Sequence, residues 1–309
     1  MVDIETSKPR RRHAGLLMAS TALAALLALG GCASTPPSTA AGAGTGARAA
    51  GDNTTATTTI ATDNEALKNA AITSTKTQDY IAAAAYWGNL YDRNPDDAET
   101  AVAYSRALRQ IGSIEQAGTV MQRAQALHGD NGPVLAEYGK VLTASGRPDQ
   151  ALIPLGRAET LAPKDWTVLS AQGVALDQMG RFAEAQTKYK TALQIDAGNP
   201  SVLTNLGLSY ALQGDLDRAE LTLRQVVSDP RATARARQNL AVVLGLKGNF
   251  DEAARVARSD LPPDVAANNI AYLREMLTQP ALWKQMEQLD KRSGEQVSSM
   301  PPSTTTSLP

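Results

Sequence analysis

The side chains best suited to nucleophilic, acid–base or metal chemistry are scarce in this chain. It contains one cysteine, Cys32, and two histidines, His13 and His128, among 309 residues. Metal sites draw mainly on cysteine and histidine, so this inventory predicts no metal and no cofactor. The motifs Ser-x-x-Lys, Gly-x-Ser-x-Gly, His-Glu-x-x-His and Walker are absent from the sequence. We therefore do not expect an enzyme.

The single cysteine follows a segment typical of protein export. Basic residues at 8–12 precede an apolar run from Ala14 to Leu29, which is shorter than the roughly 20 residues of a membrane span. The run ends in Leu29-Gly30-Gly31-Cys32, which resembles the lipobox of bacterial lipoproteins. The resemblance implies that residues 1–31 are removed and that Cys32 is acylated. An ordinary signal peptide, or a buried free cysteine, is the alternative.

The lipobox resemblance also implies a place in the cell. Ala33, rather than an aspartate, follows Cys32, which implies a protein lipid-anchored in the outer membrane and facing the periplasm. Residues 32–63 consist almost wholly of Ala, Ser, Thr, Gly and Pro, a composition that predicts a disordered tether. At the other end, we expect a short helix and a disordered tail over residues 279–309.

The segment between these ends has a period of 34 residues. Glycines recur at this spacing, at 112, 146, 180, 214 and 248, and alanines at 117, 151, 185, 219 and 253. The period and the residue types resemble the tetratricopeptide repeat, a helix-turn-helix unit. The resemblance implies an all-α superhelical solenoid over residues 64–278. About six repeats begin near Asn64, Ala98, Gly132, Trp166, Pro200 and Ala234, and an amphipathic segment from Val265 to Leu277 offers Ile270, Leu273 and Leu277 to cap the last of them.

A solenoid of this kind binds partners in the groove lined by the first helix of each repeat. The repeat family places its groove side chains at fixed unit positions, which correspond here to Arg106, Arg109, Lys140, Val174, Asp177, Leu208, Leu212, Gln238, Val242 and Leu246. This groove is predicted to be basic at its N-terminal end and apolar at its C-terminal end. It suits a protein partner with an acidic patch beside an apolar segment.

Two alternatives remain for these side chains. Val174, Leu208, Val242 and Leu246 could belong to the core, and the three basic residues could be solvated charges. The Lys and Asn that grip chaperone C-termini in one subclass of the repeat are replaced here, for example by Val102 and Arg106. With a net charge of −1 and no basic block beyond the N-terminus, we expect no nucleic-acid partner.

The last two repeats resemble a narrower family. The residues that carry this resemblance are Arg237-Gln238-Asn239-Leu240-Ala241, Asp260-Leu261-Pro262-Pro263 and Asn268-Asn269-Ile270-Ala271-Tyr272-Leu273. Together with the lipobox, they resemble the TadD family of lipoproteins from tight-adherence (Flp) pilus systems. The resemblance implies a factor that assists pilus assembly, by supporting assembly or stability of the pilus secretin. A repeat lipoprotein of another envelope or cell-wall assembly machine is the alternative.

Overall fold

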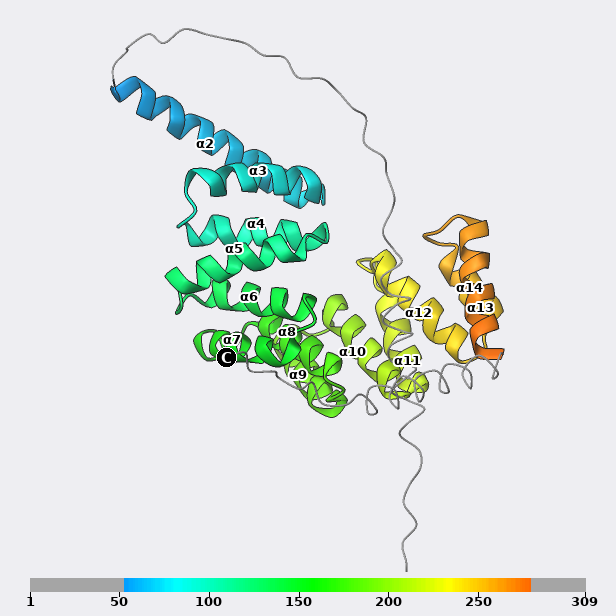
Figure 1. The fold of residues 1–309 in the computed structure, drawn as a ribbon. Coiled ribbons are helices and arrows are strands. Elements are labelled where there is room, and N and C mark those ends of the chain that lie inside the picture. The colour runs from blue at the N-terminus through cyan, green and yellow to red at the C-terminus, as the bar shows by residue number, and fades with distance from the viewer. Residues whose placement is uncertain (1–52, 279–309) are drawn as a thin grey trace, which may run out of the picture. The chain divides into compact units, whose positions relative to one another are not determined.

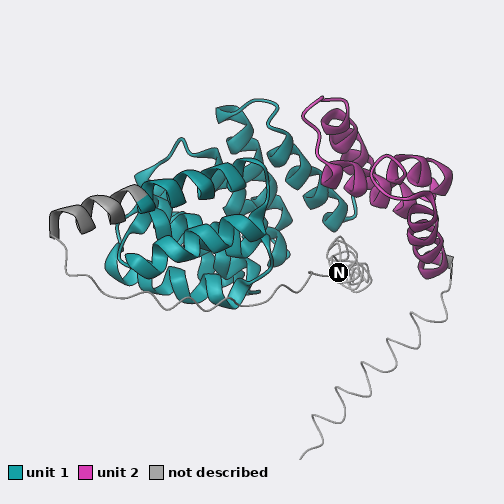
Figure 2. Ribbon diagram, turned by 90° about the horizontal axis from the view of Figure 1, so that it is seen from above, with its two compact units in different colours: residues 1–215 teal, residues 216–309 magenta. Residues whose placement is uncertain are grey.

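The computed structural model describes residues 53–278, which form thirteen helices and no strand, labelled α2 to α14 (Figure 1). The predicted all-α repeat solenoid is confirmed. None of the helices in this range has the length and apolarity that a membrane span needs. Contacts divide the chain into two compact units, one ending at Asp215 and the other beginning at Leu216 (Figure 2). We call them unit 1 and unit 2.

Unit 1 is a stack of helical hairpins. Its helices are α2 (Asn53–Lys76), α3 (Tyr80–Arg93), α4 (Ala98–Gln110), α5 (Ile114–Leu127), α6 (Gly132–Ala144), α7 (Pro148–Leu161), α8 (Trp166–Gln178), α9 (Phe182–Ile195) and α10 (Pro200–Gln213). Each of these helices contacts the next one along the chain. In addition, the first helices of the hairpins pack on one another, α4 on α6, α6 on α8 and α8 on α10.

Unit 2 continues with four helices. They are α11 (Leu216–Val227), α12 (Ala234–Leu246), α13 (Phe250–Ala257) and α14 (Pro263–Thr278). Ile270 and Leu273 of α14 are buried, as a capping helix requires, and α14 contacts both α12 and α13. The prediction that Leu277 shares this face is wrong, because Leu277 is 42% exposed in the last turn of the helix.

The helix boundaries follow from local chemistry that repeats with the period. Helices α4, α6, α8, α10 and α12 begin at the residues where the sequence places its repeat starts. The residue before each of them accepts a hydrogen bond from a backbone N–H of the first turn through its side-chain oxygen, and these caps are Asp97, Asn131, Asp165, Asn199 and Thr233. A cap of this kind stabilises a helix by about 1 kcal/mol.

The recurring glycines and alanines each have a structural cause. The five glycines have φ between 71° and 88°, the left-handed conformation that ends a helix at little cost only when no Cβ is present. The five alanines are fully buried between helices, where a larger side chain would push the helices apart. Gln78 stands at the glycine position of the first hairpin and adopts the same left-handed conformation, with φ of 61°.

The expectation that residues 53–63 are disordered is wrong. Helix α2 begins at Asn53, so residues 53–63 are helical rather than part of a disordered tether. The physical reason is that a helix already nucleated by packed residues extends cheaply, one hydrogen bond per residue, even through a threonine-rich sequence. Cys32, the rest of the predicted tether, the signal peptide and the predicted tail lie outside the described residues.

Candidate functional site

All ten side chains predicted to face the groove lie on first helices, and none belongs to the buried core. The residues Arg109, Lys140, Val174, Asp177, Leu208, Leu212, Gln238, Val242 and Leu246 are half-buried, and Arg106 is exposed. The first seven in sequence belong to unit 1, whereas Gln238, Val242 and Leu246 belong to α12 of unit 2. Half-burial leaves each of them able to touch a partner.

The basic residues of α4 surround a carboxylate that the sequence analysis did not single out. Glu137 of α6 is fully buried, and the Nε of Arg109 donates to its Oε1 at 2.9 Å. The Nε of Arg106 lies 3.5 Å from the other carboxylate oxygen. The buried Glu137 carboxylate therefore neutralises part of the positive charge at the predicted basic end of the groove. The signal that the sequence offered for Glu137 was that the equivalent position of the neighbouring repeats holds alanine, Ala103 and Ala171.

Lys140 lies one turn after Glu137 on α6 and completes the group, which we call the cationic cluster: Arg106, Arg109, Lys140 and Glu137. Burial lowers the pKa of Lys140, Glu137 partly restores it, and the two arginines lower it further. Within the described residues, Lys140 forms no ion pair and its ammonium makes no hydrogen bond. The cluster thus holds three basic side chains around one acidic partner.

The Asp177 side chain is hydrogen-bonded within the protein. Its carboxylate accepts hydrogen bonds from the Tyr189 hydroxyl at 2.8 Å and from the Ser209 hydroxyl at 2.6 Å, which links α8, α9 and α10. Burial raises the pKa of Asp177 to about 6, although both hydrogen bonds act in the opposite direction. These bonds occupy both carboxylate oxygens, so Asp177 serves chiefly to hold three helices together.

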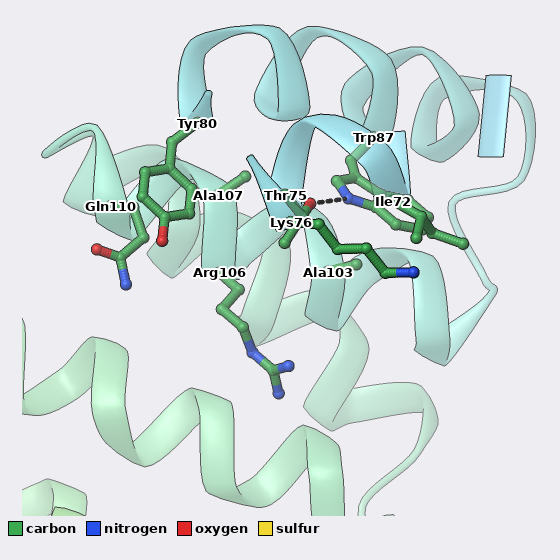
Figure 3. Close-up of a pocket in the computed structure, with 9 residues that line it drawn as sticks. All are labelled: Ile72, Thr75, Lys76, Tyr80, Trp87, Ala103, Arg106, Ala107 and Gln110. Carbon is green, nitrogen blue, oxygen red and sulfur yellow. Dashed lines mark hydrogen bonds between the residues drawn. The ribbon is translucent and has the colours of Figure 1, made fainter. Parts of the chain in front are cut away.

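A pocket opens beside the cationic cluster, between α2, α3 and α4, and its volume is about 360 Å³ (Figure 3). Its lining residues are Ile72, Thr75, Lys76, Tyr80, Trp87, Ala103, Arg106, Ala107 and Gln110. Trp87 is fixed in the wall, because its indole N–H donates to the Thr75 hydroxyl at 3.2 Å. Sequence reasoning placed Arg106 in the groove but missed the pocket itself.

The pocket has a packing cause. Both α4 residues that face it from the middle of the helix, Ala103 and Ala107, have the smallest side chain that a non-glycine residue can offer. The equivalent positions of the next first helix, α6, hold the larger Glu137 and Val141, both buried. Two alanines opposite α2 therefore leave a space that Trp87 closes on one side only.

Residues 53–278 contain no group of three histidine, cysteine, aspartate or glutamate side chains arranged to hold a metal ion. The charged, polar and apolar side chains on the first helices can make ion pairs, hydrogen bonds and apolar contacts. These are the means by which a protein surface recognises another protein.

Comparison with protein-family models identifies the repeat. Models described as tetratricopeptide repeat match residues 76–133, 178–241 and 234–259. Residues 76–133 and 178–259 therefore match tetratricopeptide repeats. Comparison with curated protein sequences gives no significant match.

Solved structures of tetratricopeptide-repeat proteins share the fold. TTC0263 of Thermus thermophilus is 19% identical, with a TM-score of 0.54, and the match covers 59% of this chain and 98% of that one. PilW, described as a widely conserved type IV pilus biogenesis factor, is 16% identical, with a TM-score of 0.56, and the match covers 67% of this chain and 98% of PilW. At these identities the likeness establishes the architecture.

In unit 2, residues that carry the resemblance to the TadD family have a structural role in the repeat. The guanidinium of Arg237 makes a two-pronged contact with Asp260, whose side chain is only 10% exposed, and it also donates to the backbone oxygen of Ala232. This contact fixes the end of α13 and the Pro-Pro break against α12. Gln238, Val242 and Leu246 lie on the same helix and stay half-buried.

Proposed function

We propose that the chain is a membrane-anchored periplasmic scaffold that binds a protein partner and assists assembly of Flp (tight-adherence) pili. Its partner is the pilus secretin or another pilus-assembly component, and its effect is to support secretin assembly or stability. The observation that carries the binding role is that the predicted groove side chains, apart from the internally bonded Asp177, lie partly or fully exposed on first helices. Tetratricopeptide-repeat stacks use that surface for recognition.

The pilus role rests on sequence. The segment with the Asp260-Leu261-Pro262-Pro263 break and the helix after it resembles the TadD family, and the structure gives this segment a defined form, with Arg237 paired to Asp260. PilW, a type IV pilus biogenesis factor, supports the proposal as an example of the same architecture in that process. The anchor in the outer membrane rests on the lipobox that ends at Cys32.

Deletion of the gene in the source cell tests the proposal. We expect loss of surface Flp pili and of secretin multimers, restored by the full chain and poorly restored by Cys32→Ala, because the scaffold would no longer be held at the membrane. Normal pili and secretin multimers in the deletion strain would contradict the proposal. If the defect instead lay in cell-wall or outer-membrane assembly, the chain would serve another envelope machine.

A photo-crosslinking amino acid at Leu212 of α10 addresses the partner directly. An adduct with a secretin would support both the pilus role and the use of the first-helix surface. Adducts confined to cell-wall enzymes would contradict the pilus role while leaving the scaffold intact.

A further inference from the structure

The pocket and the cationic cluster are joined through one side chain. Arg106 lines the pocket with its stem, and Figure 3 shows its guanidinium directed away from Trp87 and toward the next layer of helix. There its Nε lies 3.5 Å from the buried carboxylate of Glu137 on α6. An apolar hollow and a basic surface therefore adjoin each other within unit 1.

We propose that these features form one docking site for a short acidic segment of a partner protein. An aliphatic or aromatic side chain of the segment enters the pocket, and a neighbouring aspartate or glutamate binds Arg106 and Lys140. The site rests on the proposed function only in assuming a protein partner.

The pocket suits an apolar side chain. Its wall includes Trp87, which is 5% exposed, together with Ile72, Ala103 and Ala107. Its volume of about 360 Å³ lies near the lower end of the roughly 300–1,000 Å³ of ligand-binding pockets, which fits a side chain better than a large cofactor. Anchoring of one buried aliphatic or aromatic group in such a hollow is how interfaces concentrate their binding energy.

The basic residues around the pocket favour acidic residues beside the apolar side chain of the partner segment. Two basic residues, Lys76 and Arg106, line the pocket, and none of its lining residues is acidic. In the adjoining cluster, Glu137 is shared by two arginines, and Lys140 has no ion-pair partner among the described residues. A carboxylate supplied from outside would pair with Lys140 and with the exposed side of Arg106, which is 54% exposed.

A displayed library of random short peptides, selected against the purified full chain, tests the site before the partner is identified. We expect the enriched peptides to share an aliphatic or aromatic residue beside Asp or Glu. Binding of a synthetic copy of an enriched peptide is then measured by fluorescence anisotropy. Replacement of its acidic residue by Lys, or of its apolar residue by Ala, should weaken binding about tenfold or more, which is about 1.4 kcal/mol.

Variants of the protein locate the binding. Ala103→Leu fills the pocket, whereas Arg106→Gln and Lys140→Gln remove charge, and each should weaken binding about tenfold. Lys190→Gln on α9, an exposed residue away from the pocket lining, is the matched control and should bind as the unchanged chain does. Thermal unfolding verifies that each protein variant is folded. If a variant does not fold, the peptide substitutions still test the acidic and apolar contacts from the side of the ligand.

The proposal is overturned if the enriched peptides lack acidic residues, if no peptide is enriched, or if Ala103→Leu and Lys140→Gln bind as well as Lys190→Gln. It is also overturned if dodecanoate competes fully with the peptides, because the site would then serve a fatty acid. If the peptide experiment fails but the deletion strain loses its pili, the proposed function is retained and the partner binds another surface of the chain. Success here with normal pili would reject the pilus role alone.

Discussion

The first hairpin of unit 1 and the hairpins that follow it share a sequence period but differ in packing. From α4 to α10, first helices pack on one another, and buried groups such as Glu137 and Ser209 bridge them through hydrogen bonds and ion pairs. Between α2 and α4 a pocket remains, lined by small and apolar residues together with two basic ones. The difference teaches that the first hairpin leaves an open apolar space, whereas groups such as Glu137 and Asp177 in the later hairpins already have internal partners.

The largest expected effect comes from placing a leucine in a tightly packed contact between helices and, for comparison, in the pocket. Gly173 of α8 lies against Tyr189, where an added Cβ would come within 2.5 Å of the aromatic ring. Gly173→Leu should therefore lower the free energy of unfolding by about 3 kcal/mol or more. Ala103→Leu points into the pocket and should change it by less than about 1 kcal/mol. Chemical denaturation measures both, and equal losses would show that the pocket is not a usable space.

The pH dependence of stability separates the internally paired groups from the pocket. Folding raises the pKa of Asp177 from 3.8 to about 6, chiefly through burial, so the folded chain binds this proton more tightly than the unfolded chain. Unfolding then releases the proton between these two values, and the contribution of Asp177 to stability falls as the pH rises from about 4 to 6. Across that window the unchanged chain should lose about 2 kcal/mol of unfolding free energy, a figure that allows for the partial exposure of the carboxyl group. Asp177→Asn should not show this loss.

Denaturation curves of the two proteins at several pH values check this. The unfolding free energy of the unchanged chain should fall relative to that of Asp177→Asn as the pH rises through about 4 to 6, and the difference should become constant once the carboxyl group is fully ionised. A difference independent of pH would mean that Asp177 is not buried as its contacts with Tyr189 and Ser209 require.

A smaller effect concerns the turn of the first hairpin. Gln78 holds a left-handed conformation that its Cβ disfavours, whereas Gly112 holds the same conformation in the next hairpin without that cost. Gln78→Gly should stabilise the chain by about 1 kcal/mol, and Gly112→Gln should destabilise it by a similar amount. Thermal unfolding of the two variants measures the direction of each change in stability. A Gln78→Gly variant that is less stable would show that this turn does not follow the repeat rule.

Much of the fold was predictable because it is encoded locally and repeatedly. The turn glycines, the buried alanines and the starts of α4, α6, α8, α10 and α12 follow from side-chain size and backbone conformation, which the 34-residue period displays five times over. The start of α2 was missed because helix extension depends on the packed part that follows it, whereas composition suggested a tether.

The candidate site was predictable only in part. Arg106, Arg109 and Lys140 lie on first helices, as the repeat positions indicate, and their role in a groove stays a prediction. A glutamate within an apolar helix gives no sign in sequence of the arginines that reach it from another repeat. The pocket was missed because it depends on a space between α2 and α4, and Trp87, which closes it, comes from a second helix. Spaces between elements are tertiary properties, and a period alone does not contain them.

The most direct test of the account is photo-crosslinking in living cells from two positions of unit 1, Lys76 in the pocket lining and Lys190 on α9. We predict an adduct with a pilus-assembly protein from position 76 that disappears when Ala103→Leu is added, and no such adduct from position 190. The same adducts from both positions, or an adduct from position 76 that survives the filled pocket, would contradict it.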